Sequence, residues 1–339
     1  MLVLFGLGVV ACGGGAAGTF VEPGPDAPGP DASADVVTPQ TDGEVDGATL
    51  PDASDGGLDA NADVDAADGA DGAPDPVLLR FAVIGDFGAN SARELLVANL
   101  VTSWNPELIV TTGDNNYGST NESYDPNVGQ YYQSFLYPYA GAYGAGAAQQ
   151  RFFPSIGNHD WDIDNANGYA AFFNTPGLYY ELDRGPVHFV FLDSDLREPD
   201  GTSPVSTQGV WAQTSLANTA QPYSVVIFHH PALTSGSDKS NWMDWPFKGW
   251  GADVVLTGHV HNFERLRTAG GLTHFVVGQS GLGTSSFGTP HAASEKRYNA
   301  ADGAQLVEVT AKAMRLRYFT VNGALIDDIS LDPAGNPVP

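Results

Sequence analysis

The sequence has a single cysteine, Cys12, among its 339 residues. One cysteine cannot form an intrachain disulfide, and it also excludes a zinc site built from several thiolates. Basic residues are scarce too, with 14 Lys and Arg against 40 Asp and Glu and a formal net charge of −26. Proteins that bind nucleic acid present a basic surface, so this charge argues against a nucleic-acid partner.

Residues 21–76 contain no Lys, no Arg and no aromatic residue, but they hold fifteen acidic residues. A segment of this composition cannot bury enough apolar surface to offset the entropy that its ordering would cost. We therefore expect residues 13–76 to form a disordered acidic linker. Residues 77–339 hold all 14 basic residues and 25 acidic ones, a net charge of −11. This part is long enough to form one large core, and we expect it to be the folded domain.

A short apolar run, residues 2–11, precedes Cys12, and no Lys or Arg precedes that run. It is too short to span a bilayer and is typical of the apolar part of a signal peptide. Residues 9–12, Val-Val-Ala-Cys, resemble the bacterial lipoprotein box, in which the cysteine is lipidated. We expect an exported lipoprotein with a lipid anchor at Cys12, facing the periplasm or the exterior. An ordinary cleaved signal, and hence a secreted protein, is the alternative, and a start upstream of Met1 stays open.

From residue 77 onward, five short runs rich in β-branched and aromatic residues each end in a polar cluster. Such runs predict strands that are covered on both faces, and in open α/β sheets ligands bind beyond the carboxyl ends of the strands. We therefore expect the clusters to converge on one site. They are Gly85-Asp86-Phe87-Gly88, Gly113-Asp114-Asn115-Asn116-Tyr117, Gly157-Asn158-His159-Asp160, His229-His230-Pro231 and Gly258-His259-Val260-His261.

Two helices are predicted, over residues 91–104 and 207–216. The first opens on the capping-box pair Ser91 and Glu94 and carries apolar residues at helical spacing, at Leu95, Leu96, Leu100 and Val101. Residues 118–150 are rich in Tyr, Gly, Ala and Ser, and we expect them to be irregular and to rim the site. The last part of the chain predicts antiparallel strands with a hairpin turn at Asn322-Gly323, over residues 273–277, 305–310, 314–320 and 324–331.

The side chains of the five clusters are those that hard metal ions prefer, namely carboxylate, amide and phenol oxygens with imidazole nitrogens. Two such ions a few Å apart can hold the attacking and leaving oxygens of a phosphoryl transfer. Each cluster alone is a weak signal, because an Asp after a strand is usually a cap or turn residue. His259 and His261 are more informative, since alternate residues of an extended segment point the same way. The five clusters together are hard to reconcile with chance.

In this order the motifs resemble the calcineurin-like metallophosphoesterase superfamily: Gly-Asp, Gly-Asp-x-x-Tyr, Gly-Asn-His-Asp, His and Gly-His-x-His. Two details resemble the purple acid phosphatases within it. Many relatives carry Asp-x-His at the first motif, where this chain has Gly88. The lost ligand is replaced by Tyr117, three residues after Asp114, and a phenolate ligand favours trivalent iron. The resemblance covers about residues 80–331.

The resemblance implies an α/β fold, a four-layer α/β/β/α sandwich of two mixed β-sheets flanked by helices, with metals at the C-terminal ends of the strands. It implies two metal ions, Fe(III) and a divalent Zn, Mn or Fe. The first would bind Asp86, Tyr117 and His261, and the second Asn158, His229 and His259. Asp114 would bridge the two. A metal-bound hydroxide would attack phosphorus, and His159 would act as general acid toward the leaving oxygen.

Three further residues are candidates for substrate contact. His229 and His230 compete for one ligand role, because successive strand residues face opposite ways. The family pattern selects His229 and leaves His230 as a supporting or packing residue. The family's second catalytic histidine follows this ligand by about nine or ten residues, where this chain has Asp238 and Lys239. Asp238 could act as an acid with a raised pKa and Lys239 could hold phosphate, or both lie in an exposed loop.

The expected function is hydrolysis of phosphate monoesters, an acid phosphatase activity on a small phosphorylated substrate. Hydrolysis of phosphodiesters or nucleotides by the same metals is one alternative. An exported binding protein with a vestigial metal site is another, although all seven ligand positions are filled. No protein partner can be inferred from the sequence.

Overall fold

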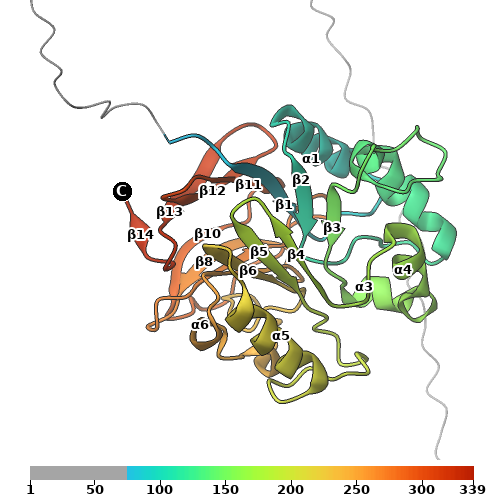
Figure 1. Ribbon diagram of the computed structural model, residues 1–339. Helices are drawn as coiled ribbons and strands as arrows, with labels where there is room; N and C mark the ends of the chain where they lie inside the picture. The colour runs from blue at the N-terminus through green and yellow to red at the C-terminus, as the bar shows by residue number, and fades with distance from the viewer. Residues whose placement is uncertain (1–74) are drawn as a thin grey trace, which may run out of the picture. The chain divides into compact units, whose positions relative to one another are not determined.

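The computed structural model describes residues 75–339 (Figure 1). The expected lipoprotein box with Cys12 lies outside the described residues, as does the expected linker except for its last two residues. Among residues 75–339, no helix combines the length and the apolar character that crossing a membrane requires.

Two seven-stranded sheets form the centre of the described part, and both contain parallel and antiparallel pairs. The first sheet has the spatial order β14 (Pro337–Val338), β13 (Leu325–Leu331), β12 (Met314–Thr320), β11 (Gly303–Val309), β1 (Leu79–Ile84), β2 (Leu108–Thr111) and β3 (Phe152–Pro154). The second has the order β10 (Ser294–Tyr298), β8 (Phe263–Arg267), β9 (Thr273–Val277), β7 (Val254–Thr257), β6 (Tyr223–Ile227), β5 (Val187–Phe191) and β4 (Tyr180–Arg184).

Helices lie against the outer face of each sheet (Figure 1). Those of the first sheet are α1 (Ala92–Ser103), α2 (Gln130–Tyr132), α3 (Asn158–Asp162) and α4 (Asn167–Phe173). Those of the second are α5 (Thr207–Asn218) and α6 (Phe247–Trp250). The described residues also form short helical turns at Asn121–Ser123, Asp125–Gly129, Gln133–Phe135, Asp164–Ala166 and Asn241–Met243.

The central strands β2, β5, β6, β7 and β9 are buried along their whole length because both of their faces are covered. On β1, Phe81 and Val83 point into the layer between the two sheets, whereas Ala82 and Ile84 point toward the helices. β6 alternates in the same way between the inter-sheet layer and the layer under α5 and α6. These layers confirm the predicted α/β fold of two mixed sheets with flanking helices.

The first predicted helix is confirmed as α1, but its buried face differs from the expected one. Leu95 and Leu96 are about half exposed, and the buried stripe starts one residue earlier, at Glu94. The Glu94 carboxyl group accepts hydrogen bonds from the backbone N–H groups of Ala89 and Asn90, which turns this polar residue inward. Leucines can be left exposed when a capping residue sets the rotation of a helix.

Two other expectations need correction. Residues 121–135 are a series of short helices rather than irregular structure, because their aromatic side chains pack onto the first sheet; Tyr124 and Tyr132 are fully buried. The strand over residues 273–277 is confirmed as β9, but it pairs parallel with β7 as well as antiparallel with β8. The hairpin between β12 and β13 is confirmed, with Gly323 at a φ of 79°.

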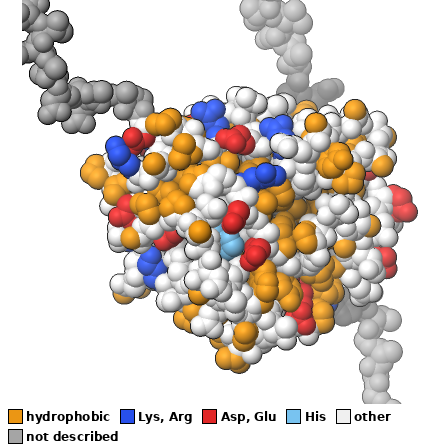
Figure 2. Space-filling view, in the orientation of Figure 1, with side chains coloured by type: hydrophobic (Ala, Val, Ile, Leu, Met, Phe, Trp, Pro, Cys, Tyr) orange, Lys and Arg blue, Asp and Glu red, His pale blue; other side chains and the backbone are white. Residues whose placement is uncertain are grey.

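Basic side chains on the surface are dispersed. On the face shown in Figure 2, Lys and Arg side chains stand apart from one another among acidic and uncharged side chains. Several are paired with carboxylates, for instance Arg80 with Glu308 at 2.6 Å and Arg315 with Asp328 at 2.6 Å.

Candidate metal centre

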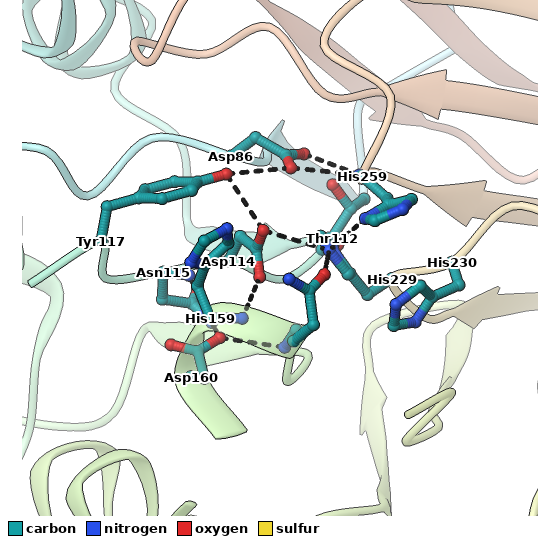
Figure 3. A network of polar contacts seen from close by, with 12 residues as sticks. Asp86, Thr112, Asp114, Asn115, Tyr117, His159, Asp160, His229, His230 and His259 are labelled. Carbon is teal, nitrogen blue, oxygen red and sulfur yellow. Dashed lines mark hydrogen bonds and ion pairs between the residues drawn. The ribbon is translucent and has the colours of Figure 1, made fainter. Parts of the chain in front are cut away.

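The five motif loops all follow the carboxyl ends of parallel strands. β1, β2 and β3 run parallel in the first sheet, and β6 and β7 run parallel in the second. Asp86, Asp114 and Asn158 follow the first three strands, and His229 and His259 follow the other two. Since the two sheets pack face to face, these ends meet at one edge, where Figure 3 shows the side chains converging around Asp114.

The loops hold an unusual backbone conformation at the site. Asp86, Asp114 and His259 have φ values of 55°, 50° and 67°, a left-handed region that costs a residue with a side chain roughly 1–3 kcal/mol. The surrounding hydrogen bonds maintain it: the Asp86 N–H donates to the Gly113 carbonyl at 3.1 Å, and the His259 N–H donates to Asp86 Oδ2 at 2.9 Å. Such strain is typical of positions whose side chains must point at a ligand.

A first group of donor atoms surrounds the Tyr117 hydroxyl. Its oxygen lies 3.2 Å from Asp86 Oδ1, 3.0 Å from Asp114 Oδ2 and 3.3 Å from His261 Nε2. His261 Nε2 is also 3.4 Å from Asp86 Oδ1. The position of Gly88 explains why no histidine is found there: its carbonyl accepts the Tyr117 N–H at 2.8 Å, and a Cβ at residue 88 would overlap the Asn115 carbonyl oxygen.

A second group surrounds His229 Nε2. This atom lies 3.0 Å from Asn158 Oδ1, 3.2 Å from Asp114 Oδ2 and 3.3 Å from His259 Nδ1. The other ring nitrogen, Nδ1, is 2.8 Å from the Thr112 carbonyl oxygen, which can only accept, so Nδ1 carries the proton. In neutral His229 the lone pair of Nε2 therefore faces a carboxylate oxygen and an amide oxygen. Lone pairs converge in this way around a cation.

One carboxylate oxygen belongs to both groups. Asp114 Oδ2 lies beside Tyr117 and beside His229, while Asp114 Oδ1 accepts the His159 N–H at 2.9 Å. All seven residues expected to bind metals are thus brought together, and Asp114 occupies the central position, as Figure 3 shows for the labelled members. A side chain placed between two donor groups is the arrangement that a bridging ligand requires.

The negative charges of Asp86 and Asp114 favour the binding of cations at the site. Burial disfavours a charged imidazole, yet the carboxylates of Asp114 and Asp86 raise the pKa of His229 to about 10. Burial, together with the charges of Asp86 and Asp114, raises the pKa of the Tyr117 phenol well above its usual value. Without a cation the phenol therefore keeps its proton. Cations would relieve the repulsion among these groups, so the donor set fits two hard metal ions.

His159 lies on the open side of this centre. Its side chain is exposed, and its ring packs against the Tyr117 ring with 4.4 Å between centroids. It belongs to α3, directly after Asn158. Its ring is outside both donor groups but adjacent to them, a position from which an imidazole can exchange protons with a bound substrate.

Three supporting residues of the site were not identified from the sequence. Asp160 Oδ2 accepts hydrogen bonds from the Asn115 side chain at 2.8 Å and from the Gly157 N–H at 2.9 Å, which ties the second motif loop to the third. Asp160 and Asn115 both lie within the motifs, so their closeness in sequence to the expected ligands could have indicated a supporting role. Thr112, whose carbonyl orients His229, had no such signal because its role is a backbone contact.

Of the three candidate substrate-contact residues, His230 packs against His229 and His259 of the second donor group, whereas Asp238 and Lys239 lie in an exposed loop. His230 is buried beyond His229 (Figure 3), and its Nδ1 is 2.9 Å from Ser194 Oγ. Asp238 and Lys239 are exposed, and Asp238 accepts a hydrogen bond from the neighbouring Ser237 hydroxyl at 2.7 Å. Their loop is anchored by Glu264, which accepts the Ser235 N–H at 2.6 Å. Within residues 75–339, neither Asp238 nor Lys239 hydrogen-bonds to the donor groups.

Comparison with protein families matches residues 79–263 to the calcineurin-like phosphoesterases. This range contains all seven donor residues and His159, and it is more than half of the chain.

Two similar curated sequences are named as acid phosphatases. Purple acid phosphatase 22 of Arabidopsis thaliana is 24% identical over 286 residues, which cover 76% of this chain and 65% of that protein. Acid phosphatase type 7 of Homo sapiens is 24% identical over 216 residues, which cover 55% of this chain and 47% of that protein. The chain thus spans between about half and just under two thirds of the length of these curated relatives.

Solved structures share the fold. Purple acid phosphatase PPD1 from yellow lupin seeds superposes with a TM-score of 0.61 at 16% identity, covering 76% of this chain and 54% of that one. GAP50, the anchor in the inner membrane complex of Plasmodium, superposes with a TM-score of 0.61 at 17% identity, covering 76% of this chain and 89% of that one. The same architecture therefore occurs in a phosphatase and in a protein described as an anchor.

Proposed function

This chain belongs to the calcineurin-like phosphoesterase family, and from that premise we propose that it is an acid phosphatase that hydrolyses phosphate monoesters at a centre of two metal ions. The observation that carries the proposal is the position of Asp114 Oδ2, which is 3.0 Å from the Tyr117 hydroxyl and 3.2 Å from His229 Nε2. A shared carboxylate oxygen keeps two cations close enough to act on one phosphate.

Each donor group suits a different ion. Asp86, Tyr117 and His261 include a phenol and suit trivalent iron, whereas Asn158, His229 and His259 suit divalent Zn, Mn or Fe. When bound, the two cations would polarise the phosphoryl group and acidify nearby water, the trivalent ion doing so to lower pH. The purple acid phosphatases among the relatives support the acid phosphatase assignment.

The chain itself supplies orientation and a proton. Thr112 fixes the tautomer of His229, and Asp160 joins the loops that carry Asp114 and Asn158. The exposed ring of His159 is free to donate a proton to the leaving oxygen of a phosphate held at the donor groups. We further propose that the chain is exported with a lipid at Cys12, so that it meets small phosphorylated substrates outside the cytoplasm.

Activity measurements on metal-loaded protein test the function. We expect hydrolysis of p-nitrophenyl phosphate to exceed that of bis-p-nitrophenyl phosphate across about pH 4 to pH 9. The reverse order would support the phosphodiesterase alternative. No hydrolysis of either compound by protein that holds both metals would support the vestigial-site alternative and sink the proposal.

His159→Ala tests the proton donor. We expect turnover to fall at least about 100-fold, because general acid catalysis typically contributes that much. Metal content, measured by plasma mass spectrometry, should stay unchanged. His291→Ala is the matched control, since the His291 ring accepts the Ala293 N–H instead of joining the donor groups. Loss of metals from the His159 variant would make His159 a ligand and contradict its assigned role.

A further inference from the structure

Aromatic side chains extend outward from the second donor group. The His230 ring packs against those of His259 and His229, with centroids 4.5 and 4.9 Å apart. The Trp242 ring follows, 5.9 Å from His230. Trp242 is 37% exposed, so part of its ring remains open to solvent beside the centre.

The Trp242 ring is held rigidly. Its Nε1–H donates to the Ser194 carbonyl at 2.9 Å, and its own carbonyl accepts the Trp245 Nε1–H at 2.8 Å. Ser194 also bonds to His230, so one residue positions both rings. A preorganised aromatic surface binds a ligand at low entropic cost.

An exposed leucine belongs to the same segment as Ser194, the residue that accepts the Trp242 hydrogen bond. Leu196 is 68% exposed and precedes Arg197, whose Nη2 donates to the Asn158 carbonyl at 3.1 Å. The Arg197 charge is already paired, with Asp195 at 2.8 Å and Asp162 at 2.8 Å. Arg197 is therefore not a free cation for a second phosphate, whereas the Leu196 side chain is open to apolar contact.

We propose that Trp242 and Leu196 bind a planar ring in the leaving group of the substrate, which would make the preferred substrates aromatic phosphate monoesters. The inference rests on the proposed function. The ring of such an ester is separated from phosphorus by one oxygen, the atom to which His159 would donate its proton. Arg197 bonds to the carbonyl of the donor residue Asn158, and Trp242 packs on His230 beside the second donor group, so both segments border a phosphate ester held there.

Binding of two phosphonates to metal-loaded protein tests the inference by calorimetry. Benzylphosphonate and methylphosphonate share a non-hydrolysable head group, and only the first carries a ring. We expect wild-type protein to bind benzylphosphonate about tenfold more tightly, a typical contribution of aromatic stacking. Trp242→Ala should abolish this preference, and Trp242→Phe should keep most of it. Tyr143→Ala is the control: it removes a different exposed aromatic ring and should keep all of the preference.

The outcomes separate the inference from the proposed function. Equal affinity of wild-type protein for the two phosphonates overturns the inference and leaves the function standing. A preference that survives Trp242→Ala does the same. If neither phosphonate binds to protein that holds both metals, the proposed function and the inference both fail. If the Trp242→Ala variant does not fold, the comparison of the two phosphonates on wild-type protein still decides the inference.

Discussion

Tyr117 is the residue that most narrows the choice of metal. Its hydroxyl lies within 3.3 Å of three other donor atoms. In the loop after β1, which it contacts, Gly88 has no space for a side chain such as histidine. Because the pKa of Tyr117 is raised well above the usual value by burial and by two carboxylates, only a strongly acidic cation would deprotonate it here.

This leads to a spectroscopic prediction. Iron-loaded wild-type protein should show a broad visible absorption band from phenolate-to-iron charge transfer, and Tyr117→Phe should abolish the band. Tyr179→Phe serves as the control, because the Tyr179 hydroxyl donates its hydrogen bond to Asp200 and not to a residue of the donor groups. A colourless wild-type protein that contains iron would contradict the assignment of Tyr117 as a ligand.

A second prediction at the residue scale concerns Glu94 and the pH dependence of stability. Burial raises its pKa from 4.5 to about 9, against the opposing effect of backbone hydrogen bonds. Below pH 4.5 the residue is protonated in both the folded and the unfolded chain. As pH rises toward 9, the unfolded chain releases this proton and the folded chain keeps it, so the free energy of unfolding falls.

Glu94→Gln removes this titration and retains an oxygen that can accept both backbone hydrogen bonds. We expect the variant to be more stable than wild type by on the order of 2 kcal/mol at pH 8, and by less as pH falls toward 4.5. Urea unfolding at several pH values measures the difference. Exposed Glu181→Gln should show no such trend. A constant difference between wild type and Glu94→Gln at all pH values would refute the explanation.

At the scale of elements, the site depends on close approach between loops from different strands. The backbone at Gly157, which follows β3, passes so near the loop after β2 that a Cβ there would overlap Asp114 Oδ1. Glycine is needed here for space, since its φ of −118° suits any residue.

Gly157→Ala should therefore displace the bridging carboxylate. We expect metal affinity to fall about 10–100-fold, the range for lost support of metal ligands. Gly249→Ala is the matched control, because a Cβ at that position in α6 has no heavy atom within 4 Å. Competition with a chromophoric chelator measures both. Unchanged affinity in Gly157→Ala would show that the loop can yield, and that Asp114 does not depend on this contact.

The elements also show where sequence patterns mislead. The apolar spacing of α1 pointed to Leu95 and Leu96, which are exposed, because spacing alone cannot show that Glu94 would be drawn inward by two backbone N–H groups. The Tyr- and Gly-rich residues 121–135 looked irregular but are helical, since buried contacts of Tyr124 and Tyr132 outweigh weak local propensity.

At the scale of the whole molecule, the centre joins the two sheets. The first donor group takes Asp86 and Tyr117 from loops of the first sheet and His261 from a loop of the second, and Asp114 and His229 meet in the same way. Bound metal would therefore hold the sheets together at this edge and oppose unfolding of the entire core.

Metal removal should lower thermal stability. Metals present at about 100 times their dissociation constant add roughly 2.7 kcal/mol, so chelation should lower Tm by about 5–10 °C, and added metal should restore it. Asp114→Asn should have a Tm that responds far less to chelator. Scanning calorimetry measures both, and a wild-type Tm indifferent to chelator would argue against metals that bridge the sheets.

The sequence by itself determined the types and order of the chemical groups. Five strand-ending clusters, with Asp86, Asp114, Tyr117, Asn158, His229, His259 and His261 in them, were sufficient to predict the α/β fold, the family and a convergent site. This was possible because strands covered on both faces are recognisable as apolar runs, and because metal ligands are a restricted set of side chains.

The tertiary structure decided how those groups are supported and what surrounds them. The hydrogen bond that the His229 ring donates to the Thr112 carbonyl, the bond between Asp160 and Asn115, and the bond from Trp242 to Ser194 each join residues that are far apart in the chain. The local sequence cannot predict such contacts, because they form only when loops from separate strands pack against one another. Backbone contacts in particular leave no residue type by which to detect them.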